Sequence, residues 1–304
     1  MSWPDASRAR VAVLGAGLMG HGIAQAFMTS DFDVAIWDPV SQAREAVRER
    51  IAEHLELMGD PRGVDVRVCS TLQDCVRDCD VVVEAAPESV STKRELIREI
   101  DLVNSECIIA SNTSVLRITE IAEGSADPGR VVGTHWWNPP YLMPLVEVVR
   151  GELTRESVAK QVSQWLSKAG KTPVDVYRDV PGFVGNRMQF ALVREAAHIV
   201  EQGICSAETV DLVARLTFGR RLAAVGPLRN ADFIGLDLTC AILDYLSPSL
   251  ADNKRAPALF REKLVAGKAG AKAGGGVYQW ADGERAAAEQ HLLNHLMTMH
   301  QNGT

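Results

Sequence analysis

The sequence predicts an α/β protein in which a doubly wound sheet is followed by an all-α C-terminal domain. Between residues 11 and 180, short apolar runs alternate with amphipathic helical stretches, a pattern typical of a parallel sheet with crossover helices. Beyond the turn cluster at residues 179–182, helical periodicity dominates. We therefore expect one domain over residues 1–180 and a helical domain over residues 181–304.

The apolar runs give the expected strands, and the periodic stretches give the expected helices. The expected strands are 11–14, 34–37, 81–85, 108–110, 131–133, 145–149 and 174–177. The expected helices are 23–29, 43–58 and 94–101 in the first domain, and 187–201, 207–218, 236–246, 256–266 and 284–299 in the second. Residues 267–276, rich in Gly, Ala and Lys, are expected to form a flexible loop.

Composition limits the function classes. Hydrophobic residues make up 46% and charged residues 23% of the 304 residues, the profile of an ordinary soluble globular protein. The net charge of -7 argues against nucleic acid or an anionic membrane as a partner. The first residues show no apolar h-region and no apolar run reaches about 18 residues, so neither a secretory signal nor a membrane span is expected. The six cysteines form no CxxC pair and have no His cluster nearby, so we expect reduced thiols, no metal site and a cytoplasmic location.

The first motif is Gly15-Ala-Gly17-Leu18-Met19-Gly20, which joins an expected strand to an expected helix. In such a turn the first Gly permits the tight bend, the second lets a pyrophosphate approach the backbone, and the third lets the helix pack close to the strand. The N–H groups at the helix start stabilise the phosphate charge. The sequence therefore predicts a Rossmann-type dinucleotide site that includes these residues.

Asp38 indicates which dinucleotide binds. It closes the next expected strand, at the spacing of the acid that accepts hydrogen bonds from the adenosine ribose. A carboxylate there repels a 2′-phosphate, and no Arg follows it directly. NAD is therefore expected as the cofactor, rather than NADP.

The segment from Gly133 to Glu147 is the most unusual in the chain. His135 follows an apolar run, and ligands of doubly wound sheets bind at the carboxyl ends of strands. A histidine there could take a hydroxyl proton while hydride leaves the carbon, and Glu147 could orient its ring. Two plainer interpretations stay open from these residues alone: a packed, hydrogen-bonded His135 beside two Trp residues, and a Glu147 on the surface of an edge strand.

Four motifs together resemble the 3-hydroxyacyl-CoA dehydrogenase family over nearly the full length. They are the Gly-rich loop; Val-Val-Glu84-Ala-Ala-Pro-Glu88-Ser-Val-Ser-Thr-Lys93; Ser111-Asn112-Thr113-Ser114 with the segment His135–Asn138–Glu147; and Pro181-Gly-Phe-Val-Gly-Asn186-Arg187. The resemblance implies that His135 is the general base and Glu147 its orienting carboxylate.

The same resemblance implies roles for other polar residues. Ser114 and Asn186 would hydrogen-bond the reacting oxygen, and Asn138 would contact both substrate and cofactor. Glu88 and Lys93 match positions near the nicotinamide end of the cofactor. Asn112 is expected to bind the cofactor as well. For Asn138, Glu88 and Lys93 a purely structural role in loops stays open.

The chain departs from the CoA-dependent members after Asp38. Those members carry a long, Lys-rich helical hairpin that holds the CoA nucleotide, whereas the stretch from Arg44 to Asp78 is short and contains no Lys. A site for the CoA phosphates should offer compensating cations. Pro144 replaces the usual Lys before Leu-Val-Glu, and Trp136-Trp137 replaces the usual Phe-Phe. These differences weaken the expectation of a CoA substrate.

The segment from Thr217 to Pro227 resembles instead the branch that oxidises free hydroxy acids or betaines. This branch includes L-gulonate 3-dehydrogenase, L-carnitine dehydrogenase and a pyridine carboxylate dehydrogenase of vitamin B6 breakdown. Its members tend to have a basic residue where Arg221 stands, so Arg221 could pair with a substrate carboxylate; a helix-terminal Arg in solvent is the alternative. Trp136 and Trp137 could stack on a flat substrate or pack in the core.

The leading hypothesis is an NAD-dependent dehydrogenase of this family that acts on a secondary or pyridine-borne alcohol of a small hydroxy acid. One alternative is an L-3-hydroxyacyl-CoA dehydrogenase for short chains. Another, of a different class, is a non-catalytic NAD-binding protein like the lens crystallins of this family. By analogy with relatives, we expect a homodimer formed through the helical domain.

Overall fold

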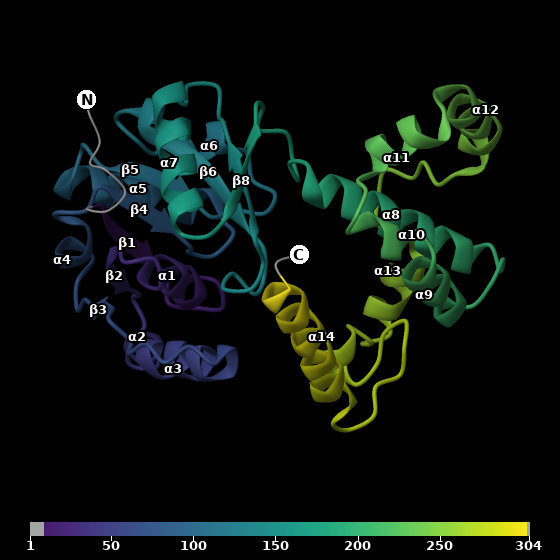
Figure 1. Ribbon diagram of the computed structural model, residues 1–304, viewed down its shortest axis with the longest axis horizontal. Coiled ribbons are helices and arrows are strands. Elements are labelled where there is room, and N and C mark those ends of the chain that lie inside the picture. The colour runs from purple at the N-terminus through teal and green to yellow at the C-terminus, as the bar shows by residue number, and fades with distance from the viewer. Residues whose placement is uncertain (1–8, 303–304) are drawn as a thin grey trace. The chain divides into compact units, whose positions relative to one another are not determined.

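An eight-stranded sheet organises the N-terminal part of the computed structural model, which describes residues 9–302 (Figure 1). Its strands are β1 (Arg10–Leu14), β2 (Asp33–Trp37), β3 (Arg67–Val68), β4 (Val81–Glu84), β5 (Ile108–Ser111), β6 (Val131–Trp136), β7 (Leu145–Val149) and β8 (Thr172–Val176). They lie in the order β3-β2-β1-β4-β5-β6-β7-β8. All neighbouring pairs are parallel except β6 and β7.

The α/β fold with a helical C-terminal part is confirmed, but two details of the expected sheet were wrong. The two-residue strand β3 was not predicted, because so short a run carries no periodicity. The expectation of a parallel sheet fails at β7, which runs antiparallel to β6. The connection over residues 137–144 contains no helix, and a parallel neighbour would need a crossover of a dozen or more residues.

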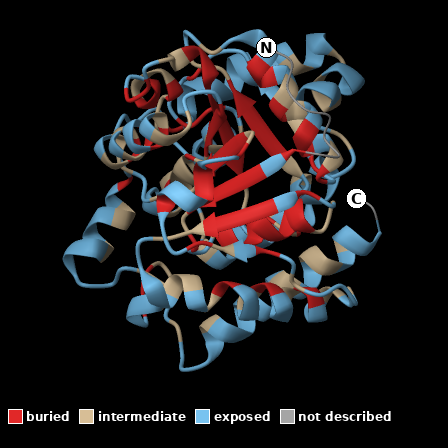
Figure 2. Cartoon of the chain, turned by 90° about the vertical axis from the view of Figure 1, so that its left-hand side faces the viewer, coloured by how far each residue is buried: buried red, intermediate tan, exposed pale blue. Residues whose placement is uncertain are grey.

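Helices cover both faces of the sheet because the strands are apolar on both sides. In β1, Val11 and Val13 face one core and Ala12 and Leu14 the other, as the two-residue period of a strand requires. Figure 2 shows the buried residues concentrated in these strands. The first core is covered by α1 (Gly20–Met28), α3 (Val47–Met58) and α7 (Glu156–Lys168), and the second by α4 (Leu72–Val76), α5 (Val90–Val103) and α6 (Ile118–Ala122). The short helix α2 (Ser41–Glu45) precedes α3.

The chain divides into two compact units, Met1–Arg187 and Met188–Thr304, and the division falls within α8 (Gly185–Glu201). The second unit is helical among its described residues, apart from isolated bridges at Gly270, Gly275 and Gln279. Its helices after α8 are α9 (Ala207–Leu216), α10 (Phe218–Leu222), α11 (Pro227–Ile234), α12 (Leu236–Leu246), α13 (Ala258–Val265) and α14 (Glu284–Gln301).

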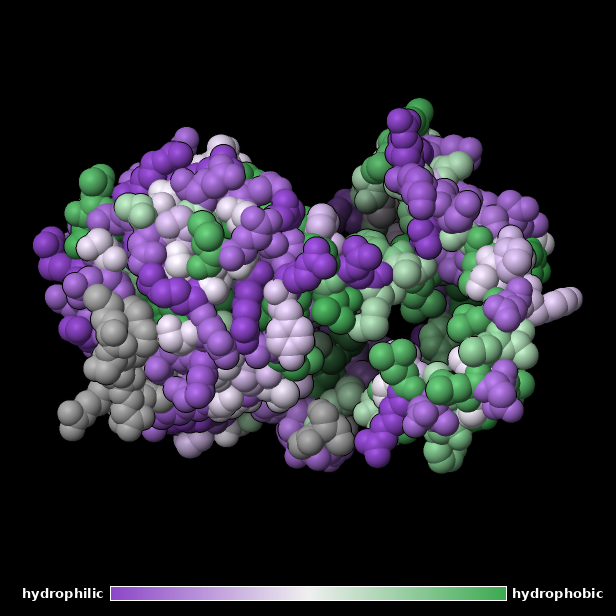
Figure 3. Space-filling model, turned by 90° about the horizontal axis from the view of Figure 1, so that it is seen from above, coloured by the Kyte–Doolittle hydropathy of each residue, from purple (hydrophilic) through white to green (hydrophobic). Residues whose placement is uncertain are grey.

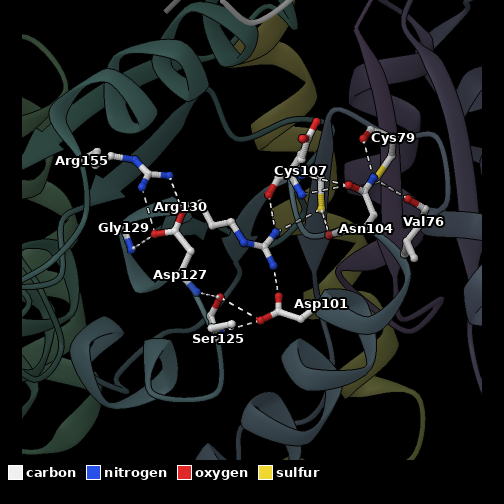
Figure 4. Close-up of polar contacts among 12 residues, drawn as sticks. Val76, Cys79, Asp101, Asn104, Cys107, Ser125, Asp127, Gly129, Arg130 and Arg155 are labelled. Atoms are coloured by element: carbon white, nitrogen blue, oxygen red, sulfur yellow. Dashed lines mark hydrogen bonds and ion pairs between the residues drawn. The ribbon is translucent and has the colours of Figure 1, made fainter. Parts of the chain in front are cut away.

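A polar network around Arg130 closes the amino edge of the parallel strands (Figure 4). Arg130 is 1% exposed and lies directly before β6. Its guanidinium pairs with Asp101 and donates to the carbonyl of Cys107, directly before β5. The Asn104 amide donates to the carbonyls of Val76 and Cys79. These contacts satisfy backbone groups where the strands begin.

The six cysteines are all free thiols, and Cys69, Cys75, Cys79 and Cys107 are buried. Within residues 9–302, no group of three or more His, Cys, Asp and Glu side chains is arranged to hold a metal ion. In the same part of the chain, no helix has both the length and the apolar character needed to cross a membrane.

Candidate active site

The Gly-rich loop after β1 requires glycine for two different reasons. Gly15 has φ +104, and a Cβ on it would lie 2.6 Å from the Ala85 carbonyl oxygen. A Cβ on Gly20 would lie 1.7 Å from the Gly15 carbonyl oxygen. At Gly17 a Cβ would meet no atom within 4 Å. The fold itself therefore needs the first and third glycines, whereas Gly17 keeps open the space that a pyrophosphate would enter.

Asp38 lies at the end of β2 beside this loop. Its carboxylate accepts hydrogen bonds from the backbone N–H groups of Ala16, at 2.7 Å, and Val40, at 2.8 Å. A cleft of about 590 Å³ opens between the loop, the end of β2 and the start of α5. Its lining includes Gly15, Gly17, Leu18, Met19, Trp37, Asp38, Val40, Pro87 and Leu96. This largely apolar cleft, with Asp38 at the end of β2, fits the adenosine half of NAD.

His135 and Glu147 form a buried hydrogen-bonded pair. The antiparallel pairing of β6 and β7 sets them directly opposite each other, and His135 Nδ1 lies 2.6 Å from Glu147 Oε2. They are 3% and 2% exposed. Because a carboxylate can only accept, Nδ1 is the donor and Nε2 remains the nitrogen able to take a proton. The plainer interpretation of Glu147 as a surface residue is wrong.

The backbone at the start of α8 holds the second oxygen of Glu147. Oε1 accepts from the N–H groups of Val184, at 2.9 Å, and Gly185, at 3.1 Å. Burial alone would raise the pKa of Glu147, but the hydrogen bonds from His135, Gly185 and Val184 outweigh it and lower the pKa. Glu147 is therefore a fixed carboxylate at neutral pH.

The two neighbouring tryptophans have different surroundings. Trp136 is 3% exposed and packs edge-on against Phe27 in the core. The ring of Trp137 lies 4.7 Å from that of His135. A Cβ on Gly185 would lie 2.3 Å from Trp137 Cζ2, so Gly185 leaves room for this indole. Of the two, only Trp137 borders the imidazole.

Ser114 and Asn186, far apart in the sequence, meet beside this pair. Asn186 Nδ2 donates to the Ser114 carbonyl at 2.9 Å, and Asn186 directly follows Gly185, whose N–H binds Glu147. Ser114 is exposed, and its hydroxyl has no hydrogen-bond partner among residues 9–302. The structure thus brings together two of the residues predicted to contact the reacting oxygen.

Glu88 and Lys93, predicted near the cofactor, belong to a network that joins the loops after β4 and β5. Lys93 is 0% exposed and pairs with Glu84 at 2.8 Å. Glu84 Oε2 also accepts from the Ser111 hydroxyl at 2.5 Å. Glu88 accepts from the N–H of Ser114 at 2.8 Å. Sequence reasoning gave Glu84 and Ser111 no role. The signal that could have pointed to Glu84 is its position as a single acidic residue at the end of an apolar run.

The connection over residues 137–144 is held by a lysine that sequence reasoning also missed. Lys171 Nζ donates to the carbonyls of Pro140, at 2.6 Å, and Met143, at 3.1 Å. Burial lowers the pKa of Lys171 to about 8. Asn138 lies in this connection, before a cis bond to Pro139.

The remaining predicted residues are Asn112 and Arg221. Asn112 follows β5, and its Oδ1 accepts from the Trp136 N–H at 3.2 Å. Arg221 lies on α10 in the second unit, where it is exposed and forms no ion pair with another described residue. Asn112 is thus bound to β6, whereas Arg221 is available to a ligand or to solvent.

Comparison with known proteins agrees with this geometry. Residues 10–180 match the NAD-binding domain of 3-hydroxyacyl-CoA dehydrogenase, and residues 182–280 match the C-terminal domain of the same enzyme. The chain belongs to the 3-hydroxyacyl-CoA dehydrogenase family. It is an NAD-dependent dehydrogenase that acts on a hydroxyl group.

Relatives include both CoA-dependent and CoA-independent enzymes. The 5-formyl-3-hydroxy-2-methylpyridine 4-carboxylate 5-dehydrogenase of Mesorhizobium japonicum is 32% identical, over 95% of this chain and 96% of its own. A probable 3-hydroxybutyryl-CoA dehydrogenase of Deinococcus radiodurans is 39% identical, over 88% of this chain and 99% of its own. A crystal structure of a 5-dehydrogenase acting on the same pyridine carboxylic acid has a TM-score of 0.90 at 31% identity, covering 96% of this chain and 97% of that one.

Proposed function

We propose that this chain transfers hydride between NAD and a secondary or pyridine-borne alcohol of a small hydroxy acid, with His135 as the general base. The observation that carries the proposal is the buried His135–Glu147 pair, whose carboxylate is held at both oxygens. Bound NAD, held at the Gly-rich loop and Asp38, would supply the hydride acceptor for the carbinol carbon. His135 takes the hydroxyl proton on Nε2, the nitrogen that Glu147 leaves free.

Glu147 supports this proton transfer in two ways. It fixes the tautomer and the orientation of the imidazole, and its negative charge stabilises the imidazolium that forms. Because hydrogen bonds keep its pKa low, Glu147 does not take the proton itself. The proton therefore rests on His135 until the reverse step or solvent removes it.

Ser114 and Asn186 are the proposed contacts of the reacting oxygen. The exposed Ser114 hydroxyl is a hydrogen-bond donor on a short side chain, next to Asn186. The Asn186 amide is oriented by the hydrogen bond that it donates to the Ser114 carbonyl. Such fixed donors favour the charge that develops on the oxygen during the reaction. We propose Asn138 and Asn112 as neighbours of the nicotinamide end, as the family resemblance implies.

The arginines after Asp38 support a substrate without nucleotide phosphates. Five of the six between Arg44 and Asp78 donate to backbone carbonyls of their own domain, which fixes the short helical segment in place. Those five are Arg44, Arg48, Arg50, Arg62 and Arg67. Cations used in this way are poorly placed to balance the several charges of CoA.

Arg221 is the proposed partner of the substrate carboxylate. Its planar guanidinium suits bidentate recognition of a carboxylate, and its exposure leaves it available. Arg221→Ala should raise KM for a carboxylate substrate roughly tenfold or more, the effect of losing a charge-assisted hydrogen bond, with kcat little changed. An unchanged KM would leave Arg221 as a surface residue.

A substrate panel followed by NADH fluorescence tests the function. The panel holds 5-formyl-3-hydroxy-2-methylpyridine 4-carboxylate, L-carnitine, L-gulonate and acetoacetyl-CoA, with NAD or NADH as the redox direction requires. We expect turnover of a free carboxylate compound. Turnover of acetoacetyl-CoA alone would favour the acyl-CoA alternative. Tight NADH binding with no turnover of any compound would favour the non-catalytic alternative.

We also propose that the chain forms a homodimer through its helical unit. In that unit, among described residues, the buried hydrophobic side chains are Ala197 and Ala251. Large apolar side chains on α11 and α12 are exposed, and Figure 3 shows such hydrophobic surface over the helical unit. Leu228 is 85% exposed, Phe233 87% and Tyr245 90%. Surface of this kind marks an interface.

Sedimentation velocity tests the dimer. Phe233→Glu should shift a dimer toward monomer, whereas Glu106→Ala, on the first unit, should not. A wild-type chain that sediments as a monomer at micromolar concentration would exclude the homodimer. The cytoplasmic location stays a prediction from the sequence.

A further inference from the structure

Three rings from distant parts of the chain stack beside the Gly-rich loop. His21 lies on α1, His54 on α3 and Tyr141 in the connection over residues 137–144. The ring centroids of His21 and His54 are 5.1 Å apart, and those of His54 and Tyr141 are 4.0 Å apart with 25° between the ring planes. We call these three residues the ring column. It joins α1 and α3, which lie side by side (Figure 1), to the connection between β6 and β7.

One end of the ring column holds the backbone of the Gly-rich loop. His21 Nδ1 lies 2.5 Å from the Gly17 carbonyl oxygen, and because a carbonyl can only accept, Nδ1 is the donor. Burial lowers the pKa of His21, so the imidazole is neutral at neutral pH. From α3, Arg50 donates to the Ala16 carbonyl at 3.2 Å. The segment that a pyrophosphate would approach is therefore tied to both helices.

The middle of the ring column is fixed by a buried amide. His54 Nδ1 lies 3.0 Å from Gln25 Oε1, and Gln25 is 1% exposed. Burial, followed by electrostatic repulsion from His21 and Arg50, lowers the pKa of His54 to about 4. His54 is therefore uncharged near pH 7, so its face packs on the Tyr141 ring without the cost of burying a charge.

The other end of the ring column lies in a tightly packed part of the connection. A Cβ on Gly22 of α1 would lie 2.9 Å from Pro140 Cγ and 3.3 Å from Tyr141 Cδ1. Lys171 Nζ holds the same segment by donating to the carbonyls of Pro140 and Met143. The connection is therefore packed directly against the helix that follows the Gly-rich loop.

We propose that His21, His54 and Tyr141 are positioning residues that tie the connection to the Gly-rich loop, so that bound NAD holds both in place. When a pyrophosphate engages the N–H groups of the loop, the loop loses freedom. The His21 ring is bound to the Gly17 carbonyl and is held with it, and the stacked rings pass this restraint to the connection. Two segments that order each other also stabilise each other. The proposal goes beyond the proposed function, because it requires only that NAD binds.

Hydrogen exchange in the connection tests the proposal without any measurement of activity. The amides of Leu142 and Met143 donate to the Pro139 carbonyl at 3.1 and 3.0 Å, so their exchange reports how often the connection opens. Exchange is compared without NADH and with saturating NADH in wild type, His54→Ala, His54→Phe and the control Glu53→Ala. Glu53 is exposed on the same helix and has no hydrogen bond or ion pair with another described residue.

The expected result is a response to NADH that depends on the ring at position 54. In wild type and in Glu53→Ala, NADH should slow exchange at the two amides roughly fivefold or more, the lower end of usual couplings between sites. In His54→Ala the slowing should fall below about twofold, because the ring column is interrupted. His54→Phe keeps a ring and should keep most of the slowing. Equal slowing in wild type and His54→Ala would overturn the proposal, and so would exchange that NADH leaves unchanged in wild type.

A double-mutant cycle on NADH affinity, measured by fluorescence titration, tests the ring column from its two ends. Tyr141→Leu keeps an apolar side chain without a ring and should raise the NADH Kd roughly fivefold, because coupling is reciprocal. In the His21→Ala background the same change should cost less than about twofold, because the column no longer reaches the loop. Additive losses would overturn the proposal, since they would show that Tyr141 acts independently of His21.

Tyr141→Phe separates the ring from the hydroxyl. It should bind NADH with the affinity of wild type, because the stacked ring is retained. A loss as large as that of Tyr141→Leu would assign the effect to the hydroxyl and contradict the ring column. Tyr141→Leu also replaces His54→Ala in the exchange experiment if His54→Ala does not fold, since it breaks the column at its other end.

Discussion

The two edges of the sheet each bury an ion pair, and the pairs have different surroundings. At the amino edge Arg130 pairs with Asp101, and its Nε has no hydrogen-bond partner among residues 9–302. At the carboxyl edge Lys93 pairs with Glu84, and four protein oxygens surround its ammonium. From there hydrogen bonds continue through Glu88 to the exposed Ser114.

The difference shows how one sheet separates stability from chemistry. The contacts of Arg130 stay at the amino edge: its guanidinium binds the Cys107 carbonyl and Asp101, and Asp101 in turn accepts from the Ser125 hydroxyl (Figure 4). Those of Lys93 lead to loops where strand ends and a helix start meet, which is where α/β sheets bind ligands. We therefore expect changes at the amino edge to alter the free energy of unfolding, and changes at the carboxyl edge to alter catalysis.

The largest expected effect is at His135. His135→Ala should lower kcat about 10²- to 10⁴-fold, the usual contribution of a general base, while NADH still binds. Steady-state kinetics and NADH titration measure the two quantities. Arg155→Ala, an exposed amino-edge change that breaks only the pair with Asp127, should leave kcat unchanged. An active His135→Ala variant would remove the histidine from the mechanism.

Arg130→Met tests the other edge. Removing Arg130 leaves Asp101 with only its hydrogen bonds from Ser125 and Ala126, so the free energy of unfolding should fall by at most about 3–5 kcal/mol, the cost of breaking a fully buried pair. Urea unfolding measures this, and kcat of the folded variant should stay near that of wild type. Asp101→Asn/Arg130→Met should recover part of the loss. A large drop in kcat with unchanged stability would contradict the separation of the two edges.

Asp38→Ala should weaken cofactor binding and its selectivity. Loss of a charged acceptor costs about 1.5–3 kcal/mol, so the NADH Kd should rise roughly tenfold or more. Discrimination against NADPH should relax because the repelling carboxylate is gone. Parallel fluorescence titrations with both cofactors measure this. Equal selectivity in variant and wild type would count against the ribose role of Asp38.

The smallest expected effect is the contribution of Lys171, at the carboxyl edge, to the pH dependence of the free energy of unfolding. Its pKa is about 8 in the folded protein, against 10.5 for an ordinary lysine. Between these values the unfolded chain binds a proton that the folded chain lacks, so stability rises with pH, by at most about 1.4 kcal/mol per pH unit. Below pH 8 the cost of the buried charge is fully present. Urea unfolding at pH 8, 9 and 10 should show this slope in wild type and a smaller one in Lys171→Met; equal slopes would refute it.

Much of the fold could be predicted because its signals are local. The Gly-rich loop, the apolar runs of β1, β2 and β4, and the helical periodicity after Pro181 depend on residues close together in the chain. The direction of β7 was mispredicted, although the short connection over residues 137–144 carried the information. The role of Glu84 was missed because its partner Lys93 lies nine residues further on, in the first turn of α5, and only packing brings the two together.

The sequence by itself determined the α/β class, the NAD loop and the family, and it predicted a candidate set of polar site residues, since each rests on local pattern or on motif spacing. The tertiary structure decided how those residues meet. Antiparallel β7 sets Glu147 opposite His135, and the start of α8 fixes that carboxylate. The folded loops turn Glu88 toward the backbone of Ser114. Such contacts join residues distant in the chain, so they arise from the packing of strands and loops and not from any local preference.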